Sequence, residues 1–538
     1  MMRRWLLLVG LAAAFASSSQ AQAVGACVTG TAQRFVENSV FRASVFNTGG
    51  LFFGGSTTSG DGYLIPKQDG TSTFYAAGLW LGGTVDGDLR VAAARYENWA
   101  FWPGPLENAA SPPSDCSTHD RIFVVSREDV RRYLTTGELT DDLRDWPYQL
   151  GAPVLDGDGD PDNYDLRAGD QPDLIGDMAA WWVMQDAGNA RLAAGSTAPM
   201  GVEVRAQAFA YRRDGQALSP ALLQTLFVRY EIINRGDQPI EAMHASMFAD
   251  PNLGAGGDDY IGTDTLRNMV FVYNDSNEDA VYGAAPPAQG IQLLMGPVVD
   301  GDTLGATATS TFINGGPPGT RDPDTAYEVY NYMRGLWGDG TPITALDNGY
   351  QTDGPVTTFM YPGDPVARAY WSHVNPGSER LPSGDRRMVL STGAFRLPPG
   401  EAQALLVAFP FGRGSDNLNS VAVMRGYAAA LQHLHAKGFF ASSPVERPEP
   451  TFELGLSRVH PNPSSGTAEA TLTLPTEARV RATVLDALGR QLEVLVDGEL
   501  AKGETVLSLP DELAPGTYLL RVRVEPGGEE TLTFTVAR

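Results

Sequence analysis

The chain has 538 residues, more than one ordinary hydrophobic core accommodates, so several modules are expected. Hydrophobic residues make up 43% of the chain and charged residues 19%, as in globular domains. The formal net charge of -25 excludes nucleic acid as a partner, because an acidic surface repels phosphate and the sequence contains no basic stripe.

The chain opens with a leader-like segment. Arg3 and Arg4 precede an apolar run over residues 5–16, and small residues follow up to residue 23. This order predicts a secretory signal peptide over residues 1–23. The run is too short for a membrane anchor, since about 20 apolar residues are needed to span a bilayer. No later stretch is long and apolar enough either, so we expect no transmembrane segment.

Two cysteines follow the leader, Cys27 and Cys116. Because an exported chain folds in an oxidising compartment, these two residues are predicted to form a disulfide. An alternative interpretation of residues 24–27, Val-Gly-Ala-Cys, is a bacterial lipobox, in which Cys27 would be a lipidated N-terminus. The polar and small residues between the apolar run and Cys27 favour the disulfide.

Residues 24–440 are predicted to form a large β-rich ectodomain, with a division into two subdomains near residue 200 as one option. The 60 glycines and 37 prolines of the chain indicate many turns between short strands. Apolar residues at helical spacing from Leu418 to Leu434, behind Asp416, predict one amphipathic helix that closes the domain. Strands are predicted at residues 73–83, 121–126, 225–237, 269–275 and 404–412.

Residues 441–453 contain Pro, Ser and Glu in place of any apolar period and predict a linker. Beyond the linker, strand-like runs alternate regularly with turns, which are expected at residues 487–490, 497–498 and 515–516. This pattern predicts a small seven-stranded Ig-like β-sandwich, so the whole chain is expected to be mainly β. Its strands are predicted at residues 454–459, 468–474, 480–485, 491–496, 505–509, 518–524 and 531–536.

Four short motifs are spaced along this tail. They are Pro461-Asn462-Pro463, the segment 486–490 with Gly489, the strand-opening Gly503, and the segment 513–519 with Pro515, Gly516 and Tyr518. With this spacing, residues 454–538 resemble the type A C-terminal sorting domain of proteins exported by the type IX secretion system of Bacteroidetes-like bacteria. His460 stands where that family usually has an aromatic residue, and the chain ends in Arg538 rather than the commoner Lys.

This resemblance implies that the type IX secretion machinery is the partner of the tail. The protein would pass through the periplasm and be secreted or held at the outer cell surface, with the tail removed or exchanged for a surface anchor. The alternative interpretation of the tail is an ordinary adhesive Ig-like module.

Motifs of catalysis are missing from the sequence: there is no H-E-x-x-H, G-x-S-x-G or Walker loop, and the six histidines are scattered. The sequence therefore favours a non-enzymatic surface or extracellular protein, with a glycan or another surface molecule as its unassigned partner. The alternative is a secreted carbohydrate-active enzyme or glycan-binding protein. Its sugar-stacking candidates, which more often fill a β core, are Trp80, Trp99, Trp102, Trp146, Trp181, Trp182, Trp337 and Trp371.

Two acidic stretches are candidate metal sites. In residues 155–165, aspartates alternate with small or rigid residues, and such oxygen-only donors suit a structural Ca²⁺ ion. An EF-hand does not fit well, because Pro161 stands where that loop needs Gly and Arg167 where it needs a bidentate Glu. A looser D-x-D-x-D calcium site remains open, and the alternative is a solvated loop. Residues 248–279 combine acids, amides and glycines and predict either a metal site or Asx turns. The predicted calcium ligands in the first stretch are Asp156, Asp158, Asp160, Asp162 and Asp165.

Overall fold

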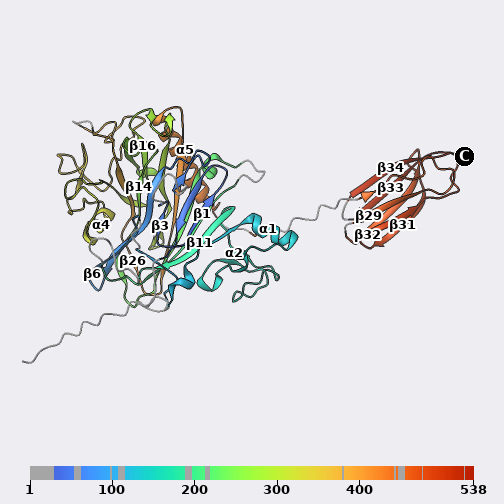
Figure 1. The fold of residues 1–538 in the computed structure, drawn as a ribbon, viewed down its shortest axis with the longest axis horizontal. Coiled ribbons are helices and arrows are strands. Elements are labelled where there is room, and N and C mark those ends of the chain that lie inside the picture. The colour runs from blue at the N-terminus through green and yellow to red at the C-terminus, as the bar shows by residue number, and fades with distance from the viewer. Residues whose placement is uncertain are drawn as a thin grey trace, which may run out of the picture. The chain divides into compact units, whose positions relative to one another are not determined.

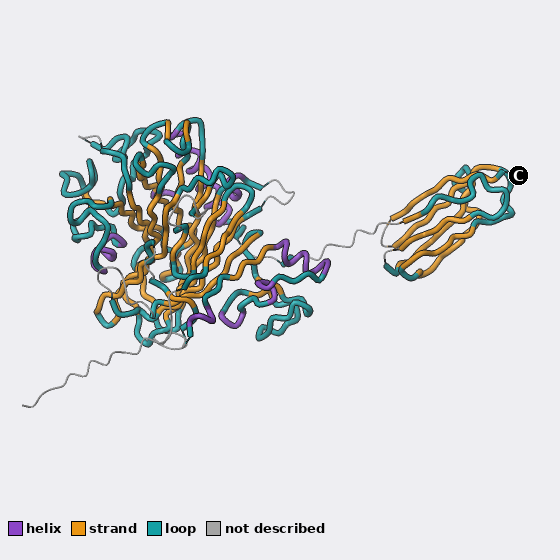
Figure 2. Tube along the Cα trace, viewed as in Figure 1, coloured by secondary structure: helices purple, strands orange, loops and turns teal. Residues whose placement is uncertain are grey.

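The computed structural model describes residues 30–53, 62–96, 100–106, 115–187, 197–212, 218–377, 381–440, 444–445, 455–474, 476–525 and 528–537. The predicted signal peptide, Cys27 and most of the predicted linker lie outside these residues. The chain divides into two compact units, one ending at Val445 and one beginning at Glu446. Both units are mainly β, as predicted (Figure 1), and strands are the main regular secondary structure of each (Figure 2).

Two large antiparallel sheets form the first unit. One runs in the order β1 (Gln33–Glu37), β2 (Arg42–Phe46), β3 (Gly50–Leu51), β5 (Phe74–Val85), β14 (Ile240–Pro251), β25 (Arg386–Thr392) and β22 (Ala306–Ile313), with β4 (Tyr63–Leu64), β6 (Asp88–Ala93) and β26 (Phe395–Leu397) as side branches. The other runs β15 (Asp259–Asp264), β16 (Met269–Asn274), β19 (Ala288–Met295), β27 (Ala402–Gly412), β13 (Thr225–Asn234), β12 (Val202–Ala210), β11 (Met178–Gln185) and β7 (Trp102–Pro103), with β8 (Phe123–Ser126) beside β11.

The main core lies between these two sheets. Val228, Tyr230 and Ile232 of β13 are fully buried in it, together with Met247 of β14 from the other sheet. The intervening Arg229 faces away and is half-buried, so the side chains of β13 alternate between the core and the outer face. Two sheets that share one apolar core are packed face to face.

The outer face of each sheet is covered by a helix and loops. On the first sheet, α4 (Ala326–Met333) packs over Trp80 and Phe248, whose rings stack with centroids 5.0 Å apart. On the second sheet, α5 (Asn417–Ala436) packs Val421 and Met424 against β16. The predicted closing helix is thus confirmed, with Asp416 as its N-cap.

Short elements complete the first unit. The helices are α1 (Arg127–Thr136), α2 (Asp141–Arg144) and α3 (Pro220–Leu223), with 3-10 turns η1 (Cys116–His119), η2 (Tyr148–Leu150) and η3 (Thr265–Arg267). Two-stranded ribbons pair β9 (Val154–Leu155) with β10 (Gln171–Pro172), β17 (Glu278–Asp279) with β18 (Gly283–Ala284), β20 (Val298–Val299) with β21 (Asp302–Thr303), and β23 (Ile343–Thr344) with β24 (Val356–Thr357).

The boundaries of the first unit differ from those expected. A division near residue 200 is not observed, because β11 and β12 flank that point and pair along their length, from Met178 opposite Ala210 to Gln185 opposite Glu203. The unit also extends beyond residue 440. The backbone amide of Val445 donates to Gln171 Oε1 at 2.9 Å, and its carbonyl accepts from Gln171 Nε2 at 3.1 Å.

All seven strands predicted for the tail are present, in two sheets. The three-stranded sheet is β28 (Gly455–Leu456), β29 (Glu469–Leu474) and β32 (Gly503–Ser508), and the four-stranded sheet is β31 (Gln491–Leu500), β30 (Ala478–Asp486), β33 (Gly516–Glu525) and β34 (Gly528–Val536). Alternate residues of β29, β30 and β33 form one core between them. The turn predicted at residues 497–498 was wrong, because β31 continues through them and pairs with β30.

Because each unit has its own core, we expect the full-length chain to unfold in two calorimetric transitions. A fragment of residues 455–538 alone should fold and reproduce the smaller transition. A single transition of the whole chain, or an unfolded fragment, would contradict the independence of the two units.

Candidate functional site

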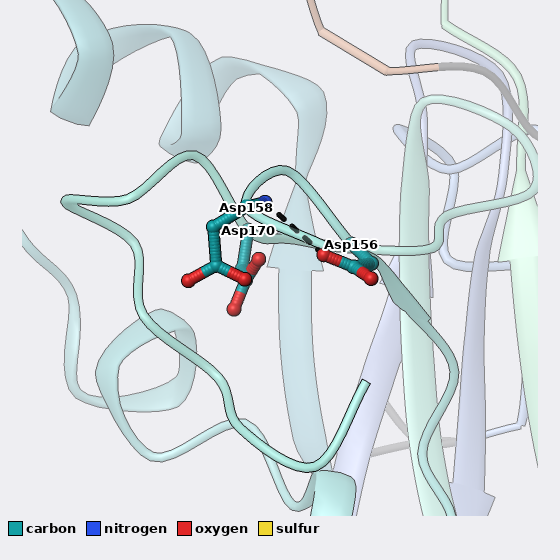
Figure 3. A group of neighbouring side chains, drawn as sticks. All are labelled: Asp156, Asp158 and Asp170. Atoms are coloured by element: carbon teal, nitrogen blue, oxygen red, sulfur yellow. Dashed lines mark hydrogen bonds between the residues drawn. The ribbon is translucent and has the colours of Figure 1, made fainter. Parts of the chain in front are cut away.

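Three carboxylates meet in the loop that joins β9 to β10. One oxygen from each of Asp156, Asp158 and Asp170 lies within 4.8 Å of the other two (Figure 3). Asp156 and Asp158 are exposed, whereas Asp170 is buried. The loop therefore presents a group of oxygen donors that is open to solvent on one side.

Backbone amides hold these carboxylates in place. Asp156 Oδ1 accepts from the amides of Asp158 at 3.1 Å and Gly159 at 2.6 Å, and Asp158 Oδ1 accepts from the amide of Asp160 at 2.9 Å. The amide of Asp160, followed by the Asn163 side chain, lowers the pKa of Asp158. These Asx turns shape the loop and stabilise the ionised form of Asp158.

The two ends of the loop touch through glycines. A Cβ atom on Gly157 would lie 2.3 Å from the carbonyl carbon of Gly169, and Gly169 has a φ of +115°, so side chains are excluded from this contact. The buried Asp170 joins the same ends, because its Oδ1 accepts from the amide of Gly157 at 2.9 Å and its Oδ2 from that of Asp165 at 2.6 Å.

The predicted calcium ligands are only partly brought together. Asp156 and Asp158 belong to the group, whereas Asp160, Asp162 and Asp165 are exposed and lie outside it. The third member, Asp170, was missed by the sequence analysis. It immediately precedes β10, and the pairing of β10 with β9 returns it to Asp156.

The donor set of this loop fits a hard cation. Calcium takes six to eight oxygen ligands at about 2.3–2.6 Å, and three carboxylates within 4.8 Å supply part of such a shell. Both Asp170 oxygens already accept amides, but each carboxylate oxygen has a second lone pair. No nitrogen or sulfur donor belongs to the group, so zinc does not fit. A bound calcium ion would pin the two ends of the loop together.

The Pro461-Asn462-Pro463 motif of the tail lies beside its last strand. The amide of Thr535 in β34 donates to Asn462 Oδ1 at 2.9 Å, and the amide of Ser464 donates to the carbonyl of Thr535 at 2.8 Å. The entry of the chain into the tail is thereby fastened to its C-terminal strand.

The other motif residues each have a local structural reason. Gly489 and Gly503 have φ angles of +80° and +123°, with open space where a Cβ would lie, so backbone conformation alone favours glycine there. The hydroxyl of Tyr518 donates to the carbonyl of Ala514 at 2.7 Å across Pro515-Gly516, as in the tyrosine corner of Ig-like sandwiches.

Cys116 is fully buried at the start of η1 and is not a free cysteine. Its predicted partner, Cys27, lies outside the described residues. The disulfide between these two residues therefore stays a prediction.

A cleft of about 780 Å³ opens on the outer side of the first sheet. Leu346, Asp347, Gln351 and Tyr361 line it with φ angles of +85°, +48°, +54° and +50°, and such strained backbone is concentrated at functional sites. Trp337 also lines the cleft but is only 4% exposed, so it offers no open stacking face. The other tryptophans that are buried in cores are Trp80, Trp146, Trp181, Trp182 and Trp371.

No family model and no curated protein matches this chain. Similar solved structures include a polysaccharide lyase (10% identity over 62% of this chain and 34% of the lyase, TM-score 0.18) and dimeric latent PorU from Porphyromonas gingivalis (10% identity, 67% and 31%, TM-score 0.15). The BSP domain of a biofilm associated protein matches with 8% identity, 67% and 60% coverage and a TM-score of 0.14. The chain spans about a third of the lyase and of PorU, and similarities this low carry no argument about activity.

Calcium bound in the aspartate loop is expected to raise the melting temperature of the first unit by about 2–4 °C at saturation, and EDTA to reverse the gain. Asp158→Asn should abolish the gain, whereas Asp160→Asn, an exposed residue outside the group, should keep it. Equal melting temperatures of the wild type in calcium and in EDTA would exclude a stabilising calcium ion in this loop, and these aspartates would then only form turns.

Loss of the tyrosine corner is expected to weaken the tail. Tyr518→Phe in the fragment 455–538 removes one hydrogen bond and should lower the free energy of unfolding in urea by about 1 kcal/mol. Val506→Ala, at an exposed position of β32, is the control and should change it by less than about 0.5 kcal/mol. An unchanged free energy of unfolding in the Tyr518→Phe fragment would show that this hydrogen bond does not stabilise the tail.

Proposed function

We propose that this chain is an exported cell-surface or extracellular protein whose C-terminal unit is a type A sorting domain for the type IX secretion machinery. The first unit is the cargo, a two-sheet domain with a binding or structural role. Calcium in the aspartate loop stabilises this cargo outside the cell.

One observation carries the proposal: the tail is a separate unit with its own core, and four of its motif residues have a local structural role. Asn462 is bound to β34, Gly489 and Gly503 adopt positive φ, and Tyr518 closes the corner before β33. An export signal attached to unrelated cargo has to fold without help from that cargo. The separate core of residues 455–537 supports such a role.

No helix in the described ranges is long and apolar enough to cross a membrane. The acidic composition gives no electrostatic attraction to anionic lipid.

A glycan-binding or glycan-cleaving role is the second candidate, and the cleft of the first unit is the observation that favours it. Asp347, Asp353 and Arg386 provide polar groups there, while the buried tryptophans argue against sugar stacking. A glycan array and a hydrolase screen on the full-length protein test this role. Reproducible turnover of any polymer would contradict the non-enzymatic role and favour an enzyme.

The sorting role is tested by fusing residues 455–538 to a reporter with a signal peptide, in a host that has the type IX machinery. We expect the reporter outside the outer membrane, and in the periplasm of the same host without the machinery. Gly489→Ala strains the motif turn and should reduce export, whereas Gly466→Ala, with open space and no positive φ, is the matched control. Retention of the wild-type fusion in the periplasm would contradict the proposal.

A further inference from the structure

The cleft on the outer side of the first sheet contains a buried positive charge. Arg386, the first residue of β25, lines this cleft and is only 9% exposed. One guanidinium nitrogen donates to the carbonyl of Pro382, and the Nε atom is buried without a hydrogen-bond acceptor in the described part of the chain. Buried donors without acceptors are rare in folded proteins, and each requires a cause.

No carboxylate of the described residues balances this charge. The neighbouring Arg387 pairs with the nearby acids, which are Asp250 at 3.0 Å, Asp322 at 3.6 Å and Asp385. None of the ion pairs between described residues involves Arg386. Because an unpaired charge is costly to bury, Arg386 is expected to bind an anionic group from outside the described chain.

The aromatic rings that the Arg386 charge influences supply no negative charge. Tyr361, which also lines the cleft, packs on His373 with ring centroids 4.0 Å apart. Burial raises the pKa of Tyr361 to about 12. Burial, and then the charge of Arg386, lower the pKa of His373 well below its usual value. Both shifts favour the uncharged ring, so neither ring balances the arginine.

Two acids line the cleft, and neither forms an ion pair with Arg386. Asp353 is exposed, so water and salt screen its charge. Asp347 is half-buried and has an interaction of its own. A ligand in the cleft therefore meets Arg386 as a buried charge and Asp353 as a screened one.

The loop that forms one wall of the cleft is fixed by buried tryptophans. Trp337 Nε1 donates to the carbonyl of Gly349 at 2.7 Å, and Trp371 Nε1 donates to that of Asp347 at 3.0 Å. These side chains hold the loop instead of offering a face for stacking. A wall that is ordered in advance lowers the entropy cost of binding a ligand.

The same loop presents neutral polar groups to the cleft. Asn348 and Gln351 line it and are exposed, and Thr352 beside them is half-buried. Side-chain amides both donate and accept hydrogen bonds, as the hydroxyl groups of a sugar do. The volume of about 780 Å³ lies within the usual range of small-molecule sites, about 300–1,000 Å³. The cleft thus combines one buried cation with groups that suit a hydroxyl-rich ligand.

We propose that the cleft binds an acidic saccharide, with the carboxylate of a uronic acid unit on Arg386 and hydroxyl groups on Asn348 and Gln351. A guanidinium matches a carboxylate in charge and in planar geometry, and such pairs are stronger than neutral hydrogen bonds. The proposal rests on the glycan-binding candidate, for which it names the class of glycan, and it is independent of the export role.

Titration calorimetry of the full-length protein with defined trisaccharides tests the proposal. The acidic probes are trisaccharides of galacturonic, glucuronic and mannuronic acid, and the matched neutral probes are trisaccharides of galactose, glucose and mannose. We expect at least one acidic trisaccharide to bind about tenfold more tightly than its neutral counterpart, or better. Sodium acetate, a carboxylate without a sugar, should not displace it at equal concentration.

Two variants assign this binding to the cleft. Arg386→Gln removes the charge and should weaken binding of the acidic trisaccharide about tenfold or more. Gln351→Glu keeps the size of the side chain but adds a negative charge, so it should weaken binding as well. Arg368→Gln, at an exposed arginine that does not line the cleft, is the matched control and should bind as the wild type does.

Unchanged affinity of Arg386→Gln, or displacement of the trisaccharide by equimolar acetate, would overturn the proposal. Equal binding of acidic and neutral trisaccharides would also overturn it but would keep the glycan-binding candidate, whereas binding of none of them would contradict both. Misfolding is distinguished by melting without ligand. Because Arg386→Gln removes an unbalanced buried charge, its melting temperature should equal or exceed that of the wild type. A lower melting temperature would contradict the proposal, since the fold itself would then need the charge.

Discussion

The burial of one apolar face of each large sheet against the other is the constraint on which the first unit depends. Strand side chains alternate, so the same strands that give Val228 and Met247 to the shared core leave Phe227 and Phe248 on the outer faces. Those outer faces also have to be covered, and this explains α4 and α5. The covering segments and strand ends, rather than the core, are left to carry polar sites.

Buried charges at the strand ends follow one rule, that each needs a partner. Asp250 sits 3.0 Å from Arg387 and accepts from the Tyr96 hydroxyl at 2.8 Å, although burial still raises its pKa to about 7. Asp264, which is also buried, lies 2.6 Å from Arg425. The ion pairs therefore offset part of the desolvation cost of both carboxylates.

Local sequence patterns were sufficient to predict most strands and the long helix, but not the residues that come together in the candidate site. The tail strands and α5 were predictable because period-2 or helical spacing lies between clear turn residues. The turn expected at residues 497–498 was wrong, since the pairing of β31 with β30 overrides the local preference of Asp-Gly. The place of Asp170 beside Asp156 depends on the register of β9 and β10, which no local spacing of residues encodes.

Export through the tail is the central claim, and protease accessibility on intact cells of the producing organism tests it most directly. The full-length chain and a chain ending at residue 445 would be compared by digestion of the first unit from outside. The account predicts that the first unit of the full-length protein is digested or released outside, while the truncated chain stays protected in the periplasm. Equal exposure of both chains at the cell surface would contradict it.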